Sequence, residues 1–167
     1  MLRIGLLSDT HGYWDDSLAS FFENCDELWH AGDIGSLEIA DKLASFKNFR
    51  AVFGNIDDHK LRVVYPKIQR FKCEEVDVFI THIGGIPGKY EPTISSIIET
   101  NPPKLFICGH SHILKVMYDK KMGFLYMNPG AAGTFGFHKF RTALRFTIDG
   151  SDIKDLEVLE IPRKGHL

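Results

Sequence analysis

Five short apolar segments of this chain each run into an aspartate, an asparagine or a histidine, and this recurrence constrains the fold more than any other feature. The segments and the polar residues after them are residues 2–7 with Asp9 and His11, 28–31 with Asp33, 49–53 with Asn55, 76–81 with His82, and 105–108 with His110 and His112. Short, nearly continuous apolar runs indicate strands that are buried on both faces. Because ligands of α/β sheets bind beyond the carboxyl ends of the strands, we expect these polar side chains to share one crevice.

Helices are predicted between the first strands. Residues 14–24 and 36–46 carry apolar side chains at helical spacing, and Ser36 is suited to cap the second helix. Strands that alternate with helices as far as residue 53 imply parallel pairing through right-handed crossovers.

The rest of the chain has a different character. We expect a strand at 68–73, a further helix that begins near Pro92, and antiparallel strands at 113–119, 124–127, 141–148 and 153–159. Two groups of strands predict two mixed β-sheets packed together with helices outside. The fold class is therefore α/β (α+β), as a single domain that spans residues 1–167.

Composition limits the cellular compartment and the classes of binding partner that we expect. The chain has 167 residues, 44% of them hydrophobic, and a formal charge of -2, so neither nucleic acid nor an anionic membrane is attracted by net charge. Three widely spaced cysteines without a CxxC pair indicate buried thiols rather than disulfides or a thiolate zinc site: Cys25, Cys73 and Cys108. We expect a cytoplasmic protein that has no membrane span.

The strand-end residues together indicate metal binding. They supply seven nitrogen and oxygen donors: Asp9, His11, Asp33, Asn55, His82, His110 and His112. Seven donors exceed what one ion takes from protein while an open position is kept, so two ions fit better. A carboxylate such as Asp33 can bridge two ions about 3.5 to 4 Å apart, which is the arrangement that clamps a phosphorus centre during in-line displacement. Imidazole and carboxylate donors without thiolate favour Mn, Fe, Ni, Co or Zn over Mg or Ca.

Each motif taken alone has a simpler interpretation. The Gly-Asp at Asp33 is also typical of a turn, Asn55 of a left-handed loop residue, and His82 of a hydrogen-bonded histidine at the edge of a core. The ordered conjunction of the motifs favours the metal site. We interpret His30 as a core or supporting histidine and Asp57 as a residue that orders the Gly-Asn turn.

The ordered motifs resemble a known family. Asp-x-His, Gly-Asp, Gly-Asn, a lone His and Gly-His-x-His, each after an apolar strand, are similar to those of the calcineurin-like metallophosphoesterase superfamily. The short chain and Asn128-Pro129-Gly130 resemble its small YfcE-type phosphodiesterases. The resemblance implies a four-layer αββα sandwich and a hydroxide between two divalent ions, Mn first, as the nucleophile. It also implies one metal held by Asp9, His11, Asp33 and His112, and the other by Asp33, Asn55, His82 and His110.

The chain departs from the family at one position. Ile56 stands where many active members carry a histidine that assists the leaving group. Loss of a general acid costs on the order of a hundredfold to ten-thousandfold, so we expect phosphodiesters or activated aryl esters to be preferred over simple phosphomonoesters. His59 and His138 are candidate substitutes, although exposed loop histidines are the simpler interpretation. Three aromatic residues of a late loop are candidates for a pocket mouth, for packing or for a subunit contact: Phe135, Phe137 and Phe140.

The leading hypothesis is a dinuclear-metal phosphodiesterase that acts on small or nucleotide-like phosphoesters, with Asp33, Asn55 and His110 in the catalytic centre. The alternatives are a catalytically weak protein-interaction scaffold, as the resemblance implies for the retromer subunit of this superfamily, and a phosphomonoesterase. We expect a small phosphoester substrate, no membrane partner and no strong binding of nucleic acid. A homo-oligomer stays open, because the apolar final hairpin is suited to pairing across a two-fold axis.

Overall fold

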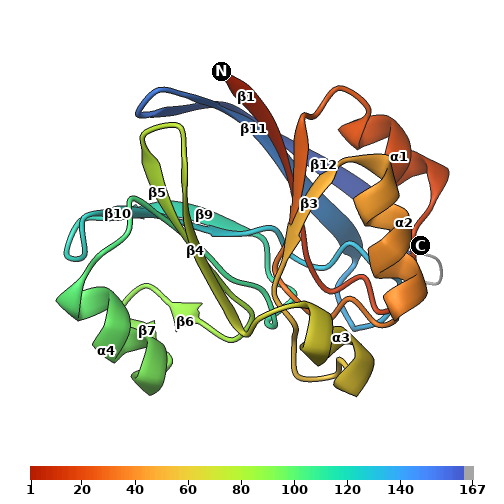
Figure 1. The fold of residues 1–167 in the computed structure, drawn as a ribbon, viewed down its shortest axis with the longest axis horizontal. Coiled ribbons are helices and arrows are strands. Elements are labelled where there is room, and N and C mark those ends of the chain that lie inside the picture. The colour runs from red at the N-terminus through yellow and green to blue at the C-terminus, as the bar shows by residue number, and fades with distance from the viewer. Residues whose placement is uncertain (164–167) are drawn as a thin grey trace.

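Two five-stranded sheets pack face to face in the computed structural model, which describes residues 1–163 (Figure 1). The first sheet has the order β12-β11-β1-β2-β3 and the second the order β4-β5-β8-β10-β9. The first is built from β1 (Leu2–Leu7), β2 (Glu27–His30), β3 (Asn48–Ala51), β11 (Phe140–Asp149) and β12 (Asp152–Pro162). The second is built from β4 (Ile68–Cys73), β5 (Val76–Thr81), β8 (Leu105–Ile107), β9 (Lys115–Asp119) and β10 (Phe124–Asn128). A separate small hairpin joins β6 (Gly85–Ile86) to β7 (Lys89–Tyr90).

Three neighbouring strands are parallel in each sheet. They are β1, β2 and β3 in the first and β5, β8 and β10 in the second, while the outer strands pair antiparallel. Parallel neighbours end at the same edge of a sheet, so the loops after these strands gather along one side of each sheet. This arrangement places the polar residues that follow the apolar runs.

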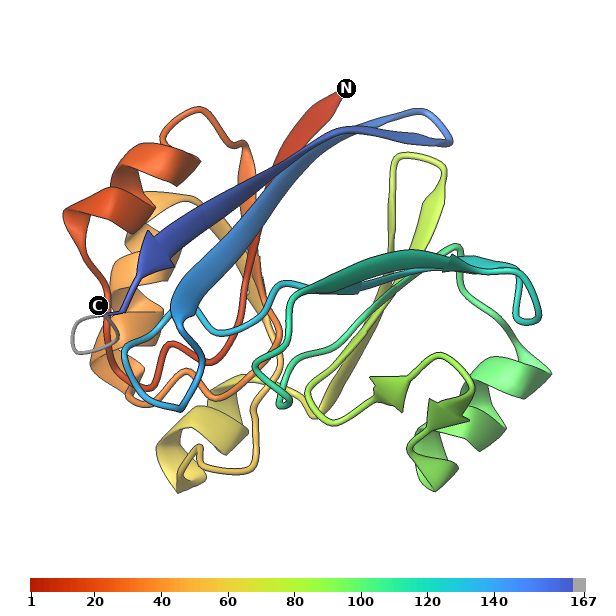
Figure 2. The ribbon, with the colours of Figure 1, turned by 180° about the vertical axis from the view of Figure 1, so that it is seen from behind.

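Helices lie outside both sheets (Figures 1 and 2). α1 (Asp16–Phe22) and α2 (Leu37–Phe46) lie on the outer face of the first sheet, and α4 (Pro92–Thr100) lies outside the second. Side-chain oxygens of Asp15 and Ser36 cap α1 and α2 by accepting the backbone N–H of Leu18 and Ile39. The short helix α3 (His59–Val64) was not predicted, because Leu61 is the one buried side chain in it and no apolar face recurs.

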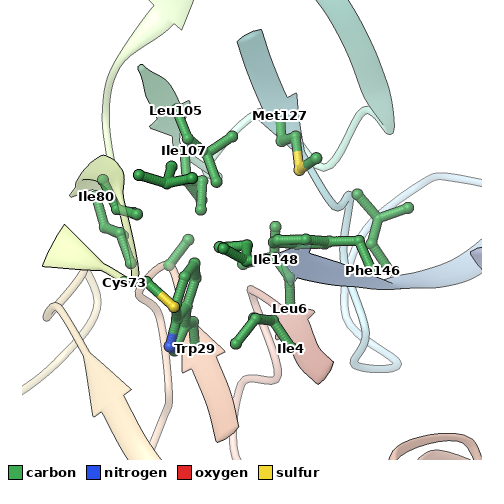
Figure 3. Packing of buried hydrophobic residues seen from close by; sticks show 14 of the residues in the cluster. Ile4, Leu6, Trp29, Cys73, Ile80, Leu105, Ile107, Met127, Phe146 and Ile148 are labelled. Carbon is green, nitrogen blue, oxygen red and sulfur yellow. The ribbon is translucent and has the colours of Figure 1, made fainter. Parts of the chain in front are cut away.

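The main core lies between the two sheets. Figure 3 shows Ile4, Leu6 and Trp29 of the first sheet meeting Leu105 and other residues of the second. On the other face of the first sheet, Leu7 packs with residues of α1 and α2 in a second cluster. Because these strands are buried on both sides, their sequences are nearly continuous apolar runs rather than alternating ones.

The predicted two-sheet sandwich with outer helices, of αββα type, is confirmed. The element limits differ modestly: β3 ends at Ala51 rather than at residue 53, and β12 extends from Asp152 to Pro162. All three cysteines are free and buried, as expected. Within residues 1–163, every helix is too short or too polar to cross a bilayer.

Truncation of the central core should destabilise the protein strongly. Leu105 is fully buried between the sheets, so Leu105→Ala should lower the free energy of unfolding by about 2 to 5 kcal/mol, measured by urea denaturation. The matched control is Leu156→Ala on the partly exposed edge strand β12, which should cost less than about 1 kcal/mol. Equal losses in the two variants would contradict the assignment of the core.

Candidate metal centre

The loops after the parallel strands bring the seven predicted ligands together. The backbone of these loops has an unusual number of residues with positive φ. Seven non-glycine residues of the described chain have positive φ, and five of them are candidate ligands. These five are Asp9 (φ 55°), His11 (46°), Asp33 (56°), His110 (71°) and His112 (63°). A left-handed residue costs about 1 to 2 kcal/mol and persists only where the surrounding structure holds it. Such a concentration of strained residues is typical of a functional site.

The first group of ligand atoms centres on Asp9. The Asp9 Oδ1 atom is 3.1 Å from His112 Nε2 and 3.8 Å from His11 Nε2. One ligand atom from each of these three residues lies within 4.8 Å of the others. The other carboxylate oxygen of Asp9 accepts hydrogen bonds from the Ser8 hydroxyl (2.6 Å) and the His110 backbone N–H (3.1 Å), which fix its orientation.

The second group centres on Asp33 and contains His82 and His110. The Asp33 Oδ2 atom is 3.2 Å from His82 Nε2 and 3.5 Å from His11 Nε2, so one oxygen lies between an imidazole of each group. The Asp33 Oδ1 atom accepts the backbone N–H of Ile56 (3.0 Å). Asp33 is therefore placed to serve both groups at once.

Asn55 completes the set from the loop after β3. Its side-chain oxygen is 3.0 Å from His110 Nδ1, and its carbonyl accepts a hydrogen bond from the Arg62 guanidinium (3.2 Å). Asn55 and His110 are exposed, whereas Asp9, Asp33 and His82 are buried. The exposed pair therefore forms the part of the site that an incoming molecule meets first.

Three buried atoms of this cluster lack a hydrogen-bond partner among residues 1–163. They are Asp9 Oδ1, His11 Nε2 and His82 Nε2. Buried polar atoms normally have hydrogen-bond partners. Three such atoms that point toward one another without partners are therefore suited to bind a common cation, which is coordinated by several nitrogen and oxygen atoms. The His82 ring supports this, because its Nδ1 is 2.7 Å from the Ala31 carbonyl and must carry the proton, which leaves a lone pair on Nε2.

The electrostatics agree with a cation site. Burial alone would raise the pKa of Asp9, but the contacts with His11 and His112 and the nearby His82 outweigh it and hold the pKa well below its usual range. Burial would lower the pKa of His82, and the carboxylates of Asp33 and Asp9 raise it instead. The low pKa of Asp9 and the raised pKa of His82 both reflect a site where negative charge is concentrated, which is the environment that a cation requires.

His30 supports the loops from behind. It is completely buried, and its ring accepts the Gly32 backbone N–H at Nδ1 (3.1 Å) and bonds the Thr10 hydroxyl through Nε2 (2.9 Å). Burial lowers the pKa of His30 to about 3, so the ring is neutral. Thr10 and Gly32 lie beside candidate ligands in the chain, so His30 acts as a supporting residue, as interpreted from the sequence.

Asp57 and Asn128 order two further loops. The buried Asp57 carboxylate accepts three backbone N–H groups, those of Ile34, Gly35 and Gly54 (3.1, 2.9 and 2.8 Å). Asp57 thereby joins the Gly-Asp loop to the Gly-Asn loop. Asn128 donates to the Gly109 carbonyl (3.1 Å) and to the Ser111 hydroxyl (3.1 Å), which holds the Gly-His-x-His loop.

Two glycines allow the loops to approach the carboxylates. A Cβ atom at Gly54 would collide with the side chain and backbone of Asp33, and one at Gly109 with the Ser8 hydroxyl. Glycine is required at both positions because the loop backbone passes directly over the ligand residue.

The other singled-out residues have different placements. His59 is exposed and is the first residue of α3, and among residues 1–163 its side chain makes no hydrogen bond or aromatic contact. The His138 ring is 5.8 Å from that of His112, and the Phe135 ring stacks on His11 at 4.8 Å with an interplanar angle of 19°. Ser8 and the stacking role of Phe135 were not predicted. The serine precedes Asp9 directly, a weak local signal, whereas nothing near Phe135 in the sequence indicates its contact.

Comparison with known proteins gives a consistent result. The model of the calcineurin-like phosphoesterase superfamily domain matches residues 2–151. A probable metallophosphoesterase of Mycoplasma pneumoniae is 32% identical over 138 residues, which cover 78% of this chain and 79% of that protein.

Solved structures share the fold at lower identity. An archaeal phosphodiesterase superposes with a TM-score of 0.71 and 21% identity, over 95% of this chain and 100% of that one. Wild-type Vps29 of Entamoeba histolytica complexed with Zn²⁺ superposes with a TM-score of 0.75 and 14% identity, over 96% and 99%. At these identities the likeness establishes the fold alone.

The three hydrogen bonds of the Asp57 carboxylate should stabilise the folded protein. In Asp57→Asn one acceptor oxygen becomes an N–H₂ group that faces backbone donors, so unfolding free energy should fall by about 1 to 3 kcal/mol in urea denaturation. The control is Asp58→Asn, in which asparagine still caps α3, and its stability should change by less than about 0.5 kcal/mol. An unchanged free energy of unfolding in Asp57→Asn would show that these hydrogen bonds do not contribute to stability.

Proposed function

The chain belongs to the calcineurin-like phosphoesterase superfamily, and from this premise we propose that it is a hydrolase of phosphodiesters that uses two divalent metal ions. The observation that carries the proposal is the position of Asp33 Oδ2 between His82 Nε2 (3.2 Å) and His11 Nε2 (3.5 Å). A carboxylate oxygen that lies near one imidazole from each ligand group is placed to contact both ions, as a bridging ligand does.

The ligand sets follow the two groups of atoms. Asp9, His11, Asp33 and His112 would hold one ion, and Asp33, Asn55, His82 and His110 the other. Nitrogen and oxygen donors without thiolate fit Mn²⁺, Fe²⁺, Co²⁺, Ni²⁺ or Zn²⁺, and among these we expect Mn²⁺ first from the resemblance to the family. When bound, the ions lower the pKa of water and neutralise charge on the phosphoester.

The residues of the chain contribute orientation. His110 and Asn55 are the exposed members of the set, so we expect the phosphate oxygens of a substrate to approach them first. Their mutual contact, at 3.0 Å, holds both side chains in one geometry, which lowers the cost of orienting the substrate. Asp33 supports this loop as well, because it accepts the backbone N–H of Ile56.

Ile56 shapes the choice of substrate. An isoleucine cannot donate a proton to a departing alkoxide, so the leaving group must accept its charge with little help. Aryl and other activated phosphodiesters meet this condition better than simple alkyl phosphomonoesters. We therefore place the protein among phosphodiesterases of small or nucleotide-like esters, acting in the cytoplasm, where three free thiols stay reduced.

Activity should depend on the proposed bridge. With Mn²⁺, the protein should hydrolyse bis(p-nitrophenyl) phosphate faster than p-nitrophenyl phosphate, and Asp33→Ala or Asn55→Ala should lower kcat/KM by at least about a hundredfold. The matched control is Asp41→Ala on the exposed surface of α2, which should keep full activity. A faster monoester reaction would refute the diester preference, and no turnover by the fully metal-loaded protein would favour a protein-interaction scaffold.

Metal stoichiometry should reveal the number of ions. After chelation, dialysis and reloading, mass spectrometry of the metal should give two equivalents of Mn²⁺ or Zn²⁺ per chain. His112→Ala removes a ligand of one ion only and should retain about one equivalent, while Asp33→Ala should weaken both. One equivalent in the unmodified protein would contradict the dinuclear proposal.

A further inference from the structure

Large exposed apolar side chains occur beside the candidate ligands. Ile56, Ile83 and Ile113 each directly follow a candidate ligand in the chain, and their side chains are 46%, 40% and 56% exposed. Phe135 is 65% exposed and stacks on His11. We call these four residues the apolar rim. Exposed apolar groups gathered at a polar site are typical of ligand-binding surfaces.

Phe135 is the part of the rim with a defined geometry. Its ring lies 4.8 Å from the His11 ring, centroid to centroid, and is nearly parallel to it at 19°. One face of the phenyl ring therefore rests on a candidate ligand, and most of the rest of the side chain is open to solvent. A flat aromatic surface beside a phosphoester site is suited to stacking with another ring.

The loop that carries Phe135 is fastened on both sides. The Gly133 backbone N–H donates to the Asp9 carbonyl (3.1 Å), which ties the start of the loop to a ligand residue. The guanidinium of Arg163, a largely buried residue, donates to the carbonyls of Gly136 and His138, the latter at 3.2 Å. These contacts hold Phe135 in place before a substrate arrives, which reduces the entropy lost on stacking.

We propose that Phe135 determines specificity by stacking on an aromatic ring of the substrate, a nucleobase or aryl group attached through the ester that is not cleaved. The proposal rests on the proposed function, because it places the phosphodiester at the adjacent metal centre. The isoleucines of the rim supply apolar contact to the same group and no charge. Polar diesters that lack a ring gain nothing from this surface.

The test compares two substrates with the same leaving group. p-Nitrophenyl thymidylate carries a nucleobase and methyl p-nitrophenyl phosphate does not. Phe135→Ala should lower kcat/KM for the thymidylate ester by about tenfold, chiefly through KM, and change it less than about twofold for the methyl ester. Phe135→Trp keeps a flat ring and should retain the preference.

Controls separate stacking from support of His11. Phe137→Ala makes the same change in the same loop at a side chain that is 96% exposed, and both substrates should react as with the unmodified protein. An equal loss on both substrates in Phe135→Ala would mean that Phe135 only positions His11, and no loss would mean that it has no role. Either result overturns the proposal.

A second measurement distinguishes failure of this inference from failure of the proposed function. If the unmodified protein hydrolyses neither ester, the phosphodiesterase assignment fails, and calorimetric titration of the metal-loaded protein with thymidylate then decides the inference. Binding that weakens about tenfold in Phe135→Ala supports stacking. Equal affinity in the two proteins, or no binding, overturns it.

Discussion

The structure depends on holding two buried carboxylates, Asp9 and Asp33, around the same imidazoles. His11 Nε2 and His82 Nε2 each lie within 4 Å of an oxygen of both aspartates. Two buried anions are costly unless positive charge is supplied close by. The unpartnered atoms Asp9 Oδ1, His11 Nε2 and His82 Nε2 show where the described side chains leave that compensation incomplete. The loops around the cluster are best understood as the means of keeping it assembled.

Those loops use hydrogen bonds to offset backbone strain. Asp57 gathers N–H groups from two loops, Asn128 fixes the third, and His30 links Thr10 to Gly32 from within the core. A typical hydrogen bond contributes on the order of 1 kcal/mol, which is comparable to the cost of one left-handed residue, and one to a carboxylate contributes more. The hydrogen bonds of Asp57, Asn128 and His30 therefore offset the backbone strain at the five ligands. The parallel strands of the two sheets hold these supporting residues in place.

The sequence allowed the fold and the convergence of the seven side chains to be predicted because both follow from strand ends. Apolar runs that stop at polar residues indicate approximately where β1, β2, β3, β5 and β8 end, and parallel pairing sends those ends to one edge of each sheet. Other features have no such local signal. The helix α3 buries only Leu61, and the strands β6 and β7 have two residues each. The contacts of His110 with Asn55 and of Phe135 with His11 join residues from separate loops and depend on loop paths that no spacing encodes.

The ligand residues and the exposed residues beside them differ in how firmly the structure holds them. The ligand residues are fixed by strained backbone, buried partners and glycines such as Gly54 and Gly109, so little can change there without loss of the cluster. Among the residues that directly follow ligands, Ile56, Ile83 and Ile113 are exposed, and at Ile56 the side chain is apolar where a proton donor would favour a different leaving group. The same position that removes acid assistance adds apolar surface to the rim. The proposed selectivity for activated esters thus follows from Ile56, whereas the proposed selectivity for an aromatic substrate group follows chiefly from Phe135.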